Sequence, residues 1–419
     1  TVMNFLQFAV WGAYLTSMGR YLGTAGFGSE IGNFYAMQGL VSLFMPALMG
    51  IVADRWIPAQ RLLGLCHTFA GMLMLGVFLY TQTDTPSYPT LFALYSLSVA
   101  FYMPTLALSN SVAYTSLDQA GLDLVKSFPP IRVFGTVGFI CTMITVSLLG
   151  LEATSGQFAV SAIISLVLAV YAQTLPNCPT APKGQSKSLV EALGLRAFVL
   201  FKQRKMALFF IFSMLLGVSL QITNGFANPF ISTFGEIPAY ADTFGVKYAN
   251  ILISLSQLSE TLCILLIPFA LRRFGIRRVM LIAMVAWVLR FALLGLGNPG
   301  SGVWLFLLSM IVYGVAFDFF NVSGSLFVDK ETDPSIRSSA QGLFMIMTNG
   351  IGATLGSLGA QAVINHFVHT EHDTTAILAG WSMSWYIFAG YAAVVAVLFA
   401  VLFRDRKSTR LNSSHSGES

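Results

Sequence analysis

Long, nearly continuous apolar segments constrain the fold of this chain more than any other feature. Hydrophobic residues make up 55% of its 419 residues and charged residues only 10%, against about 25% charged residues in a soluble domain. A helix needs about 20 mostly apolar residues to cross a bilayer. Twelve stretches meet this requirement, at approximately residues 2–22, 31–53, 60–81, 90–116, 130–151, 157–175, 206–232, 246–271, 278–296, 302–328, 337–367 and 380–403. We therefore expect an all-α membrane protein with twelve transmembrane helices.

The basic residues are distributed unevenly between the two sides of these segments. If both chain ends face the cytoplasm, that side holds Arg55, Arg61, Lys126, six residues from Lys183 to Lys205, Arg272, Arg273, Arg277, Arg278, Lys330, Arg337 and the C-terminal cluster. Only Arg20 and Lys247 fall near outer ends. This asymmetry follows the positive-inside rule. We expect a multi-pass protein with both termini cytoplasmic, and the net charge of +5 does not indicate nucleic-acid binding.

The apolar segments divide six and six around a polar stretch. We expect an N-terminal six-helix bundle at residues 1–175, a cytoplasmic linker at 176–205 and a C-terminal six-helix bundle at 206–407. The linker opens with three prolines, which interrupt helices, and continues in a pattern typical of an amphipathic helix on the inner membrane surface. Residues 408–419 are expected to be a disordered tail or a cloning remnant. The chain lacks a short basic leader before its first segment, which leaves open whether its N-terminus is truncated.

Corresponding loops of the two halves are related. The loop after the second segment contains Gly50, Asp54 and Arg55, in the spacing Gly-x-x-x-Asp-Arg that resembles the signature of the major facilitator superfamily. In the second half, Pro268 and Arg272 stand where Gly and Asp would be. Six-helix repeats are the layout of that superfamily. We expect Asp54 and Arg55 to belong to a gating loop, although inner loops are commonly basic in any membrane protein.

Two acidic residues occupy costly positions. Only Glu260 and Asp318, of 18 acidic residues, lie deep inside apolar segments. A charge at the bilayer centre costs about 2.5–3.5 kcal/mol on insertion scales, so a carboxylate kept there faces a cavity or a partner. We expect both to line a pathway for a solute and for protons.

Further polar and aromatic side chains recur at spacings of three or four residues, which place them on one helical face. They are Gln257 with Glu260, Tyr313 with Phe317, the series Gln221, Asn224 and Asn228, and the series Arg132, Thr136 and Phe139. Amides match the edge of a nucleobase, aromatic rings offer stacking faces, and a carboxylate accepts two hydroxyl groups of a sugar diol. The set suits a planar, polyhydroxylated, uncharged solute. Each amide could instead join packed helices, and Arg132 could simply mark the inner end of its helix.

Features of other protein classes are missing from the sequence. It contains no Ser-His-Asp arrangement, no Gly-rich phosphate loop and no zinc-ligand spacing, so we expect no enzymatic activity, no cofactor and no metal site. His366, His369 and His372 are spaced by three, but they accompany no cysteine or paired carboxylate and are expected in a solvated loop. The four cysteines fall in helices or the linker and indicate no disulfides.

The chain resembles the nucleoside:proton symporter family of the major facilitator superfamily over nearly all of residues 2–403. The resemblance is strongest in Phe128–Thr136, Phe209–Gly217, Gln221–Asn224, Ser254–Glu260 and Met310–Asn321. It implies nucleoside uptake driven by the proton gradient across a bacterial inner membrane, with the proton as coupling ion. It implies substrate-binding positions at Arg132, Thr136, Phe139, Gln221, Asn224, Gln257, Glu260, Tyr313 and Phe317. Glu260 and Asp318 are the two expected proton-coupling residues, and the sequence leaves open which carboxylate carries the proton. Of the two, Glu260 is also expected to bind the ribose, and Asp318 is the better candidate to couple protonation to movement.

Three alternatives to nucleoside uptake remain. A sugar or oligosaccharide symporter uses the same fold, and a nucleoside sensor would bind without transport. A drug:proton antiporter is disfavoured because the fifth segment lacks the Gly-Pro-x-x-Gly-Gly run of exporters and shows only Gly135 and Gly138. The expected partners are a nucleoside, protons and membrane lipid, and we expect a monomer.

Overall fold

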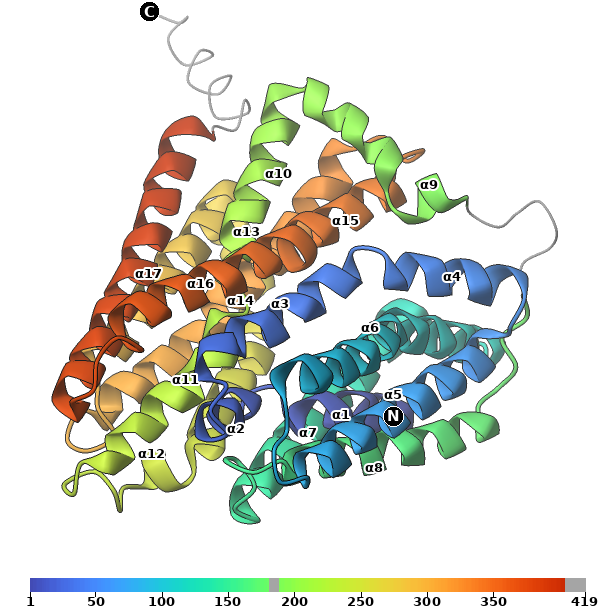
Figure 1. Cartoon of the computed structure of the whole chain (residues 1–419). Coiled ribbons are helices and arrows are strands. Elements are labelled where there is room, and N and C mark those ends of the chain that lie inside the picture. The colour runs from blue at the N-terminus through green and yellow to red at the C-terminus, as the bar shows by residue number, and fades with distance from the viewer. Residues whose placement is uncertain (181–187, 404–419) are drawn as a thin grey trace, which may run out of the picture.

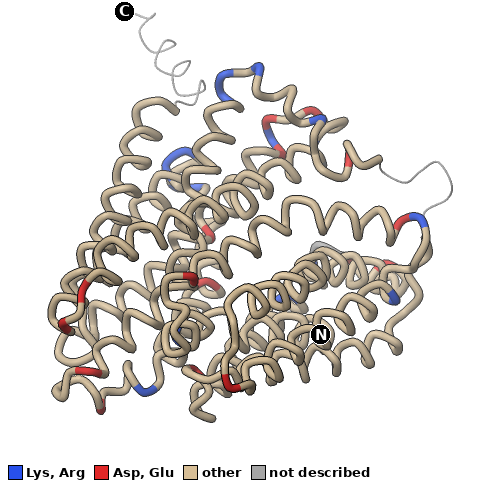
Figure 2. Tube along the Cα trace, in the orientation of Figure 1, with Lys and Arg blue, Asp and Glu red and all other residues tan. Residues whose placement is uncertain are grey.

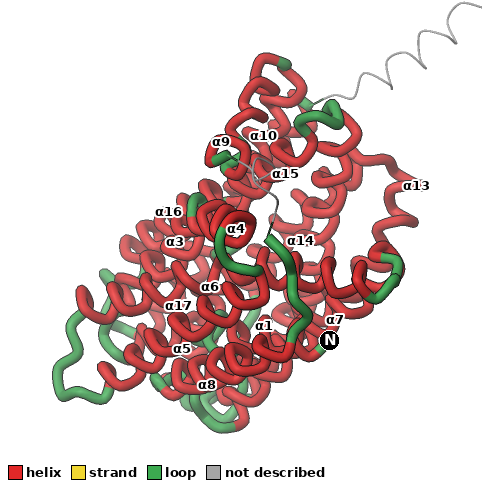
Figure 3. The backbone as a smooth tube through the Cα atoms, turned by 90° about the vertical axis from the view of Figure 1, so that its right-hand side faces the viewer, coloured by secondary structure: helices red, strands yellow, loops and turns green. Residues whose placement is uncertain are grey.

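The computed structural model describes residues 1–180 and 188–403, which form helices joined by short connections (Figure 1). No β-strand occurs in these residues (Figure 3). Within this described part of the chain, ten helical stretches are long and apolar enough to cross a membrane. One of them contains two of the expected segments, and the first expected segment is broken into shorter helices, so all twelve are accounted for. The all-α membrane fold is confirmed. The expected tail at 408–419 and the middle of the linker lie outside the described residues.

The N-terminal half comprises the helices before the linker. They are α1 (Val2–Gly12), α2 (Met18–Thr24), η1 (Gly28–Glu30), α3 (Ile31–Ser42), α4 (Met45–Arg55), α5 (Ala59–Thr81), α6 (Tyr88–Gln119), α7 (Leu124–Leu148), α8 (Gly156–Tyr171) and η2 (Ala172–Thr174). Helix α5 packs on α6 and α8, and α1 packs on α7 and α8. Helix α7 begins before Pro129 and Pro130. Arg132 therefore lies within the helix and not at its end.

The C-terminal half follows α9 (Leu189–Ala192) and η3 (Leu195–Lys202), which belong to the linker. Its helices are α10 (Arg204–Gly217), α11 (Ile222–Thr233), η4 (Phe234–Glu236), α12 (Phe244–Lys247), α13 (Ala249–Leu296), α14 (Val303–Glu331), α15 (Arg337–Met345), the π-helical segment η5 (Ile346–Gly352), α16 (Ala353–Phe367) and α17 (Thr374–Leu402). Helix α13 packs on α14 and α17. Its two parts meet at Gly275, whose φ of 79° favours glycine.

Two expected segments are broken at corresponding places in the two halves. The first is interrupted at residues 13–17, between α1 and α2, and the seventh at residues 218–221, between α10 and α11. Irregular backbone at membrane depth requires other hydrogen-bond partners. The Leu15 carbonyl accepts from the Tyr35 hydroxyl, and the Ser17 hydroxyl donates to Gln157 at 3.0 Å. The hydrophobic periodicity of the sequence cannot reveal these two breaks, because the residues on both sides of each break remain apolar.

The two halves meet most closely at the end of the molecule opposite the linker. There α3 packs on α16, α2 on α11, and α7 on α13. The Gly32 N–H donates to Gln361 Oε1 at 2.6 Å, and a Cβ at position 32 would lie 2.5 Å from the Ser357 carbonyl oxygen. We call the end that carries α9 and η3 the linker end, and the opposite end the Glu152 end. Lys and Arg gather mainly at the linker end (Figure 2).

Candidate functional site

A central cavity of about 580 Å3 lies between the two halves. Its volume falls in the range of about 300–1,000 Å3 that small-molecule sites occupy. All nine predicted binding residues line it: Arg132, Thr136, Phe139, Gln221, Asn224, Gln257, Glu260, Tyr313 and Phe317. Ala192 and Leu193, at the end of α9, also contribute to the lining, so the cavity extends toward the linker end.

Helix α7 supplies the three predicted binding residues of the N-terminal half. The spacing of Arg132, Thr136 and Phe139 places all three on the face of α7 that borders the cavity. The Arg132 guanidinium lies 3.9 Å from the ring centroid of Phe8. Phe139 meets Trp11 edge-on at a centroid distance of 6.3 Å. This wall therefore combines one cation with fixed aromatic surfaces.

The break in the seventh segment supplies two amides from the C-terminal half. Gln221 immediately precedes α11, and Asn224 lies in the first turn of that helix. Asn224 Nδ2 donates to Gln221 Oε1 at 2.9 Å. This bond uses one donor and one acceptor, so each amide retains hydrogen-bonding capacity for a solute.

Helices α13 and α14 complete the wall. Gln257 and Glu260 lie one helical turn apart on α13. On α14, the rings of Tyr313 and Phe317 stack with a centroid distance of 5.6 Å and an interplanar angle of 16°. The Glu260 carboxylate attracts the Arg132 guanidinium of the opposite half. The cavity thus offers a stacked aromatic pair, three amides and a charge pair that spans the two halves.

Asp318 lies behind this wall and does not line the cavity. Its side chain is buried, with 3% of the residue exposed, and Oδ2 has no hydrogen-bond partner. It interacts electrostatically with Glu260. Two neighbouring buried carboxylates repel each other when both are ionised.

The predicted gating residues are far from the cavity wall. Asp54 and Arg55 form the last two positions of α4 and are absent from the lining. Helix α4 contacts α9 of the linker. Both residues therefore lie at the linker end, where α4 meets the linker. For the three histidines, no group of His, Cys, Asp or Glu suited to a metal ion occurs among the described residues.

The sequence analysis missed three amide side chains of the lining. Gln38 on α3, Asn110 on α6 and Asn349 in η5 all border the cavity. Gln38 Nε2 donates to the Tyr95 hydroxyl at 2.9 Å, whereas Gln38 Oε1 and Asn110 Oδ1 are buried without a partner. Single polar residues in apolar helices carry no periodic signal, so no pattern separates them from helix-packing residues.

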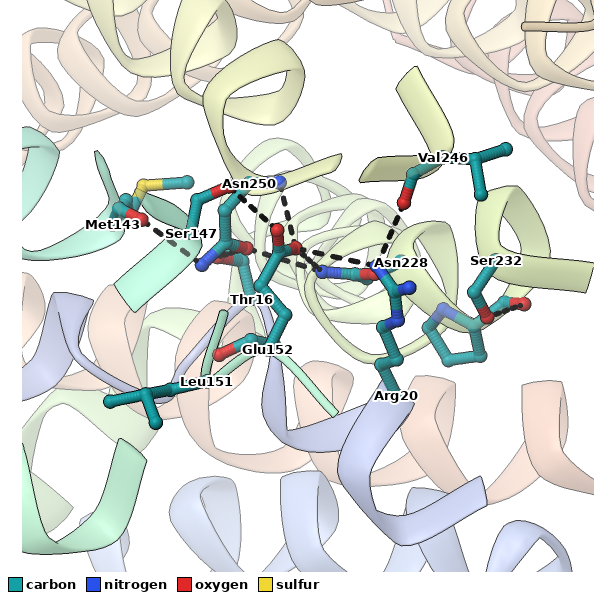
Figure 4. A network of polar contacts seen from close by, with 12 residues as sticks. Thr16, Arg20, Met143, Ser147, Leu151, Glu152, Asn228, Ser232, Val246 and Asn250 are labelled. Atoms are coloured by element: carbon teal, nitrogen blue, oxygen red, sulfur yellow. Dashed lines mark hydrogen bonds and ion pairs between the residues drawn. The ribbon is translucent and has the colours of Figure 1, made fainter. Parts of the chain in front are cut away.

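The sequence analysis also missed a buried polar network at the Glu152 end (Figure 4). Glu152 belongs to the N-terminal half, and only 3% of it is exposed. Its Oε1 accepts hydrogen bonds from Asn228 Nδ2 at 2.8 Å and from the Asn250 N–H at 2.9 Å, both in the C-terminal half. Thr16 donates to Asn250 Oδ1 at 2.9 Å. Asn228, expected in one stripe with Gln221 and Asn224, thus serves this network and does not line the cavity.

Comparison with known proteins identifies the family of the chain. The family model described as "Nucleoside H+ symporter" matches residues 1–408. The chain belongs to the nucleoside H+ symporter family. Xanthosine permease of Escherichia coli is 50% identical over 406 residues, which cover 96% of this chain and 94% of the permease. Nucleoside permease NupG of the same organism is 47% identical with the same coverage.

Solved structures agree with this membership. A crystal structure of a mutant of the nucleoside transporter NupG matches with a TM-score of 0.90 and 46% identity, over 96% of this chain and 98% of that one. A D-xylose–proton symporter matches with a TM-score of 0.67 at 13% identity, which shows the fold alone. The nucleoside H+ symporter family comprises transporters, so the predicted class of proton-coupled nucleoside symporter is confirmed and an enzyme is excluded.

Proposed function

We propose that this chain imports nucleosides together with protons and that the central cavity holds the nucleoside. The observation that carries this proposal is the convergence of nine side chains from four helices and one helix break on a single cavity of about 580 Å3. A nucleoside needs a stacking face, hydrogen bonds at the base edge and a partner for the ribose diol. The cavity offers all three.

Each wall of the cavity carries side chains that suit one part of a nucleoside. The base stacks on the Tyr313 and Phe317 rings and bonds along its edge to Gln221 and Asn224. Glu260 accepts the two ribose hydroxyls. Because Glu260 is also attracted to Arg132 in the opposite half, the ribose meets both halves at once.

The halves exchange access by separating at one end while closing at the other. Glu152, Asn228 and Asn250 close the Glu152 end, and the cavity extends to α9 at the linker end. The concentration of Lys and Arg at the linker end supports a cytoplasmic location for it, with both termini inside. The structure then corresponds to the inward-facing state. Asp54 and Arg55 stabilise closure of the linker end in the opposite state.

Protonation accompanies this cycle. The buried Asp318 lies next to Glu260 but outside the cavity, so it is suited to carry a proton without contacting the nucleoside. A proton taken up from outside removes the repulsion between the two carboxylates and favours the closed, loaded state. We propose the proton as the coupling ion without any cofactor, in a monomer surrounded by lipid in the bacterial inner membrane.

A counterflow assay tests the assignment. Proteoliposomes preloaded with unlabelled uridine should accumulate labelled uridine, and external nucleosides should compete. Competition by free ribose or disaccharides, with none by nucleosides, would identify a sugar symporter. Binding of uridine without counterflow would identify a sensor.

A further inference from the structure

Arg290 is a buried cation that neither the binding site nor the proton pathway accounts for. It lies in the second part of α13, inside an expected membrane segment, and only 2% of it is exposed. No carboxylate pairs with it within residues 1–180 and 188–403. Its Nε is buried without a partner. A charge in this environment is costly and marks a functional constraint.

The contacts of Arg290 join the two C-terminal walls of the cavity from behind. One terminal nitrogen donates to Thr223 Oγ1 at 3.1 Å, and Thr223 immediately precedes the cavity residue Asn224. The other donates to the Ser309 carbonyl on α14 at 2.9 Å. The Ser309 hydroxyl in turn donates to the Arg290 carbonyl at 2.9 Å. The side chain therefore ties α11, which carries an amide of the site, to α14, which carries the aromatic pair.

The guanidinium also holds the aromatic wall directly. Its carbon lies 4.6 Å from the ring centroid of Tyr313. Trp287 meets the same ring edge-on at 6.0 Å, and Phe317 stacks on it. Three neighbours thus fix the plane of the Tyr313 ring, and Arg290 is the one that also contacts α11.

We propose that Arg290 is a positioning residue for nucleoside binding. Its guanidinium orients the Tyr313 ring and fixes the position of that ring relative to Asn224. The claim rests on the proposed function of the cavity. Arginine is required because its planar fork reaches two acceptors while its face lies on the ring. A lysine would keep the charge but could not satisfy this geometry.

Measurements of thermal stability and of uridine affinity distinguish a positioning role of Arg290 from a role in helix packing alone. Because no carboxylate pairs with Arg290 among the described residues, replacing it by an apolar side chain of similar volume leaves no buried charge without its partner. We therefore expect purified Arg290→Met to keep its thermal unfolding midpoint while uridine binds about thirtyfold more weakly, the size of a desolvated cation–π contact. Arg290→Lys should fall between the two. In a Tyr313→Leu background, Arg290→Met should weaken binding little further, because the ring it positions is gone.

Arg277→Met is the matched control. This arginine of the same helix also binds backbone carbonyls of another helix, those of Ala400 at 2.6 Å and Phe403 at 2.7 Å, but lies away from the cavity. Its replacement should leave uridine affinity unchanged. Unchanged affinity in Arg290→Met, or an equal loss in the Arg277→Met control, would overturn the proposal.

A measurement made without nucleoside tests whether Arg290 orients Tyr313, independently of the proposed transport function. With 3-fluorotyrosine at position 313, the wild-type protein should give one narrow 19F resonance, and Arg290→Met should broaden or split it. A single narrow resonance in both proteins contradicts positioning by Arg290. Failure of the wild-type protein to bind any nucleoside contradicts the proposed function instead, and the 19F result then still decides whether Arg290 orders the ring.

Discussion

The Glu152 carboxylate of the N-terminal half accepts a hydrogen bond from the backbone N–H of Asn250 in the C-terminal half at 2.9 Å. Asn228 donates to the same oxygen at 2.8 Å. A buried charged acceptor that loses its donors must be rehydrated. Separation of the halves at this end breaks both hydrogen bonds and exposes Oε1 to water, while Ser147 and Arg20 of the same half stay with the carboxylate. This contact therefore contributes to the balance between the two access states.

Replacing Glu152 by alanine should shift that balance toward opening of the Glu152 end. The change leaves the buried Asn250 N–H without its acceptor in the closed state, whereas Asn228 Nδ2 keeps its bond to Asn250 Oδ1 at 3.2 Å. An unpaired buried donor costs about 1–3 kcal/mol, which corresponds to about tenfold in population. Thr85 and His372 are exposed positions in loops of opposite halves. Double electron–electron resonance should show a longer distance between spin labels at these two positions in the variant than in the wild type. The control Glu30→Ala removes a carboxylate whose amide partner, Asn33, lies in the same half, and should leave the distances unchanged. Equal distances in Glu152→Ala and wild type would contradict the account.

A methyl group at Gly32 should obstruct the same closure sterically. Its Cβ would lie 2.5 Å from the Ser357 carbonyl oxygen across the α3–α16 contact, which is shorter than a van der Waals contact. Alanine otherwise favours a helix by about 1 kcal/mol over glycine. We expect Gly32→Ala to lower the rate of uridine uptake at least tenfold without loss of folded protein.

Gly359→Ala serves as its control. This glycine lies on α16, and a Cβ there meets no atom within 4 Å, so uptake should remain at the wild-type rate. Normal uptake by Gly32→Ala would show that the α3–α16 contact does not have to form during transport.

Variants of the two buried carboxylates, Glu260 and Asp318, should distinguish nucleoside binding from proton coupling. Glu260→Gln replaces the two charged acceptor oxygens that face the ribose diol by one neutral acceptor and one donor, and it removes the attraction to Arg132. Uridine binding should therefore weaken at least tenfold, about the worth of a charged hydrogen bond. Asp318→Asn should retain uridine binding and counterflow but lose accumulation driven by a proton gradient, because Asp318 does not line the cavity. Calorimetry and counterflow measure the two properties. The assignment is wrong if Asp318→Asn loses binding while Glu260→Gln keeps it.

Gln221→Ala should impair recognition of the base. It removes the amide that bonds to Asn224 at 2.9 Å and leaves Asn224 without that acceptor. Affinity for uridine should fall about tenfold, as expected for a neutral hydrogen-bonding group. Competition binding with labelled uridine measures the change. Gln203→Ala, at an exposed glutamine before α10, should bind like wild type, and wild-type affinity in Gln221→Ala would rule out its contact with the base.

The helical spacing of polar residues predicted much of the cavity. Gln257 with Glu260, and Tyr313 with Phe317, stand on single faces of long helices, and position along a regular helix is readable from the chain. Apolar length likewise located the spans. Whether these residues serve the solute is a question for the variants above.

The contacts between halves could not be predicted in the same way. Glu152 stands at the end of an apolar segment, where an acidic residue is ordinary, and it is buried only because Asn228 and Asn250 approach from the other half. Arg290 is visible in the sequence as a cation inside an apolar segment, but its partners Thr223 and Tyr313 come from two other helices, so its contacts could not be predicted. The break at residues 218–221 lies in apolar sequence without a proline. Each depends on tertiary packing that no local pattern encodes.

Coupled flux in proteoliposomes tests the central claim most directly. Vesicles with the purified protein, an internal pH dye and an inward proton gradient receive labelled uridine outside. We predict that uridine accumulates above its external concentration and acidifies the interior as it enters, and that Asp318→Asn abolishes both effects. Uridine that merely equilibrates, or that enters without protons, would contradict proton-coupled nucleoside import through this cavity.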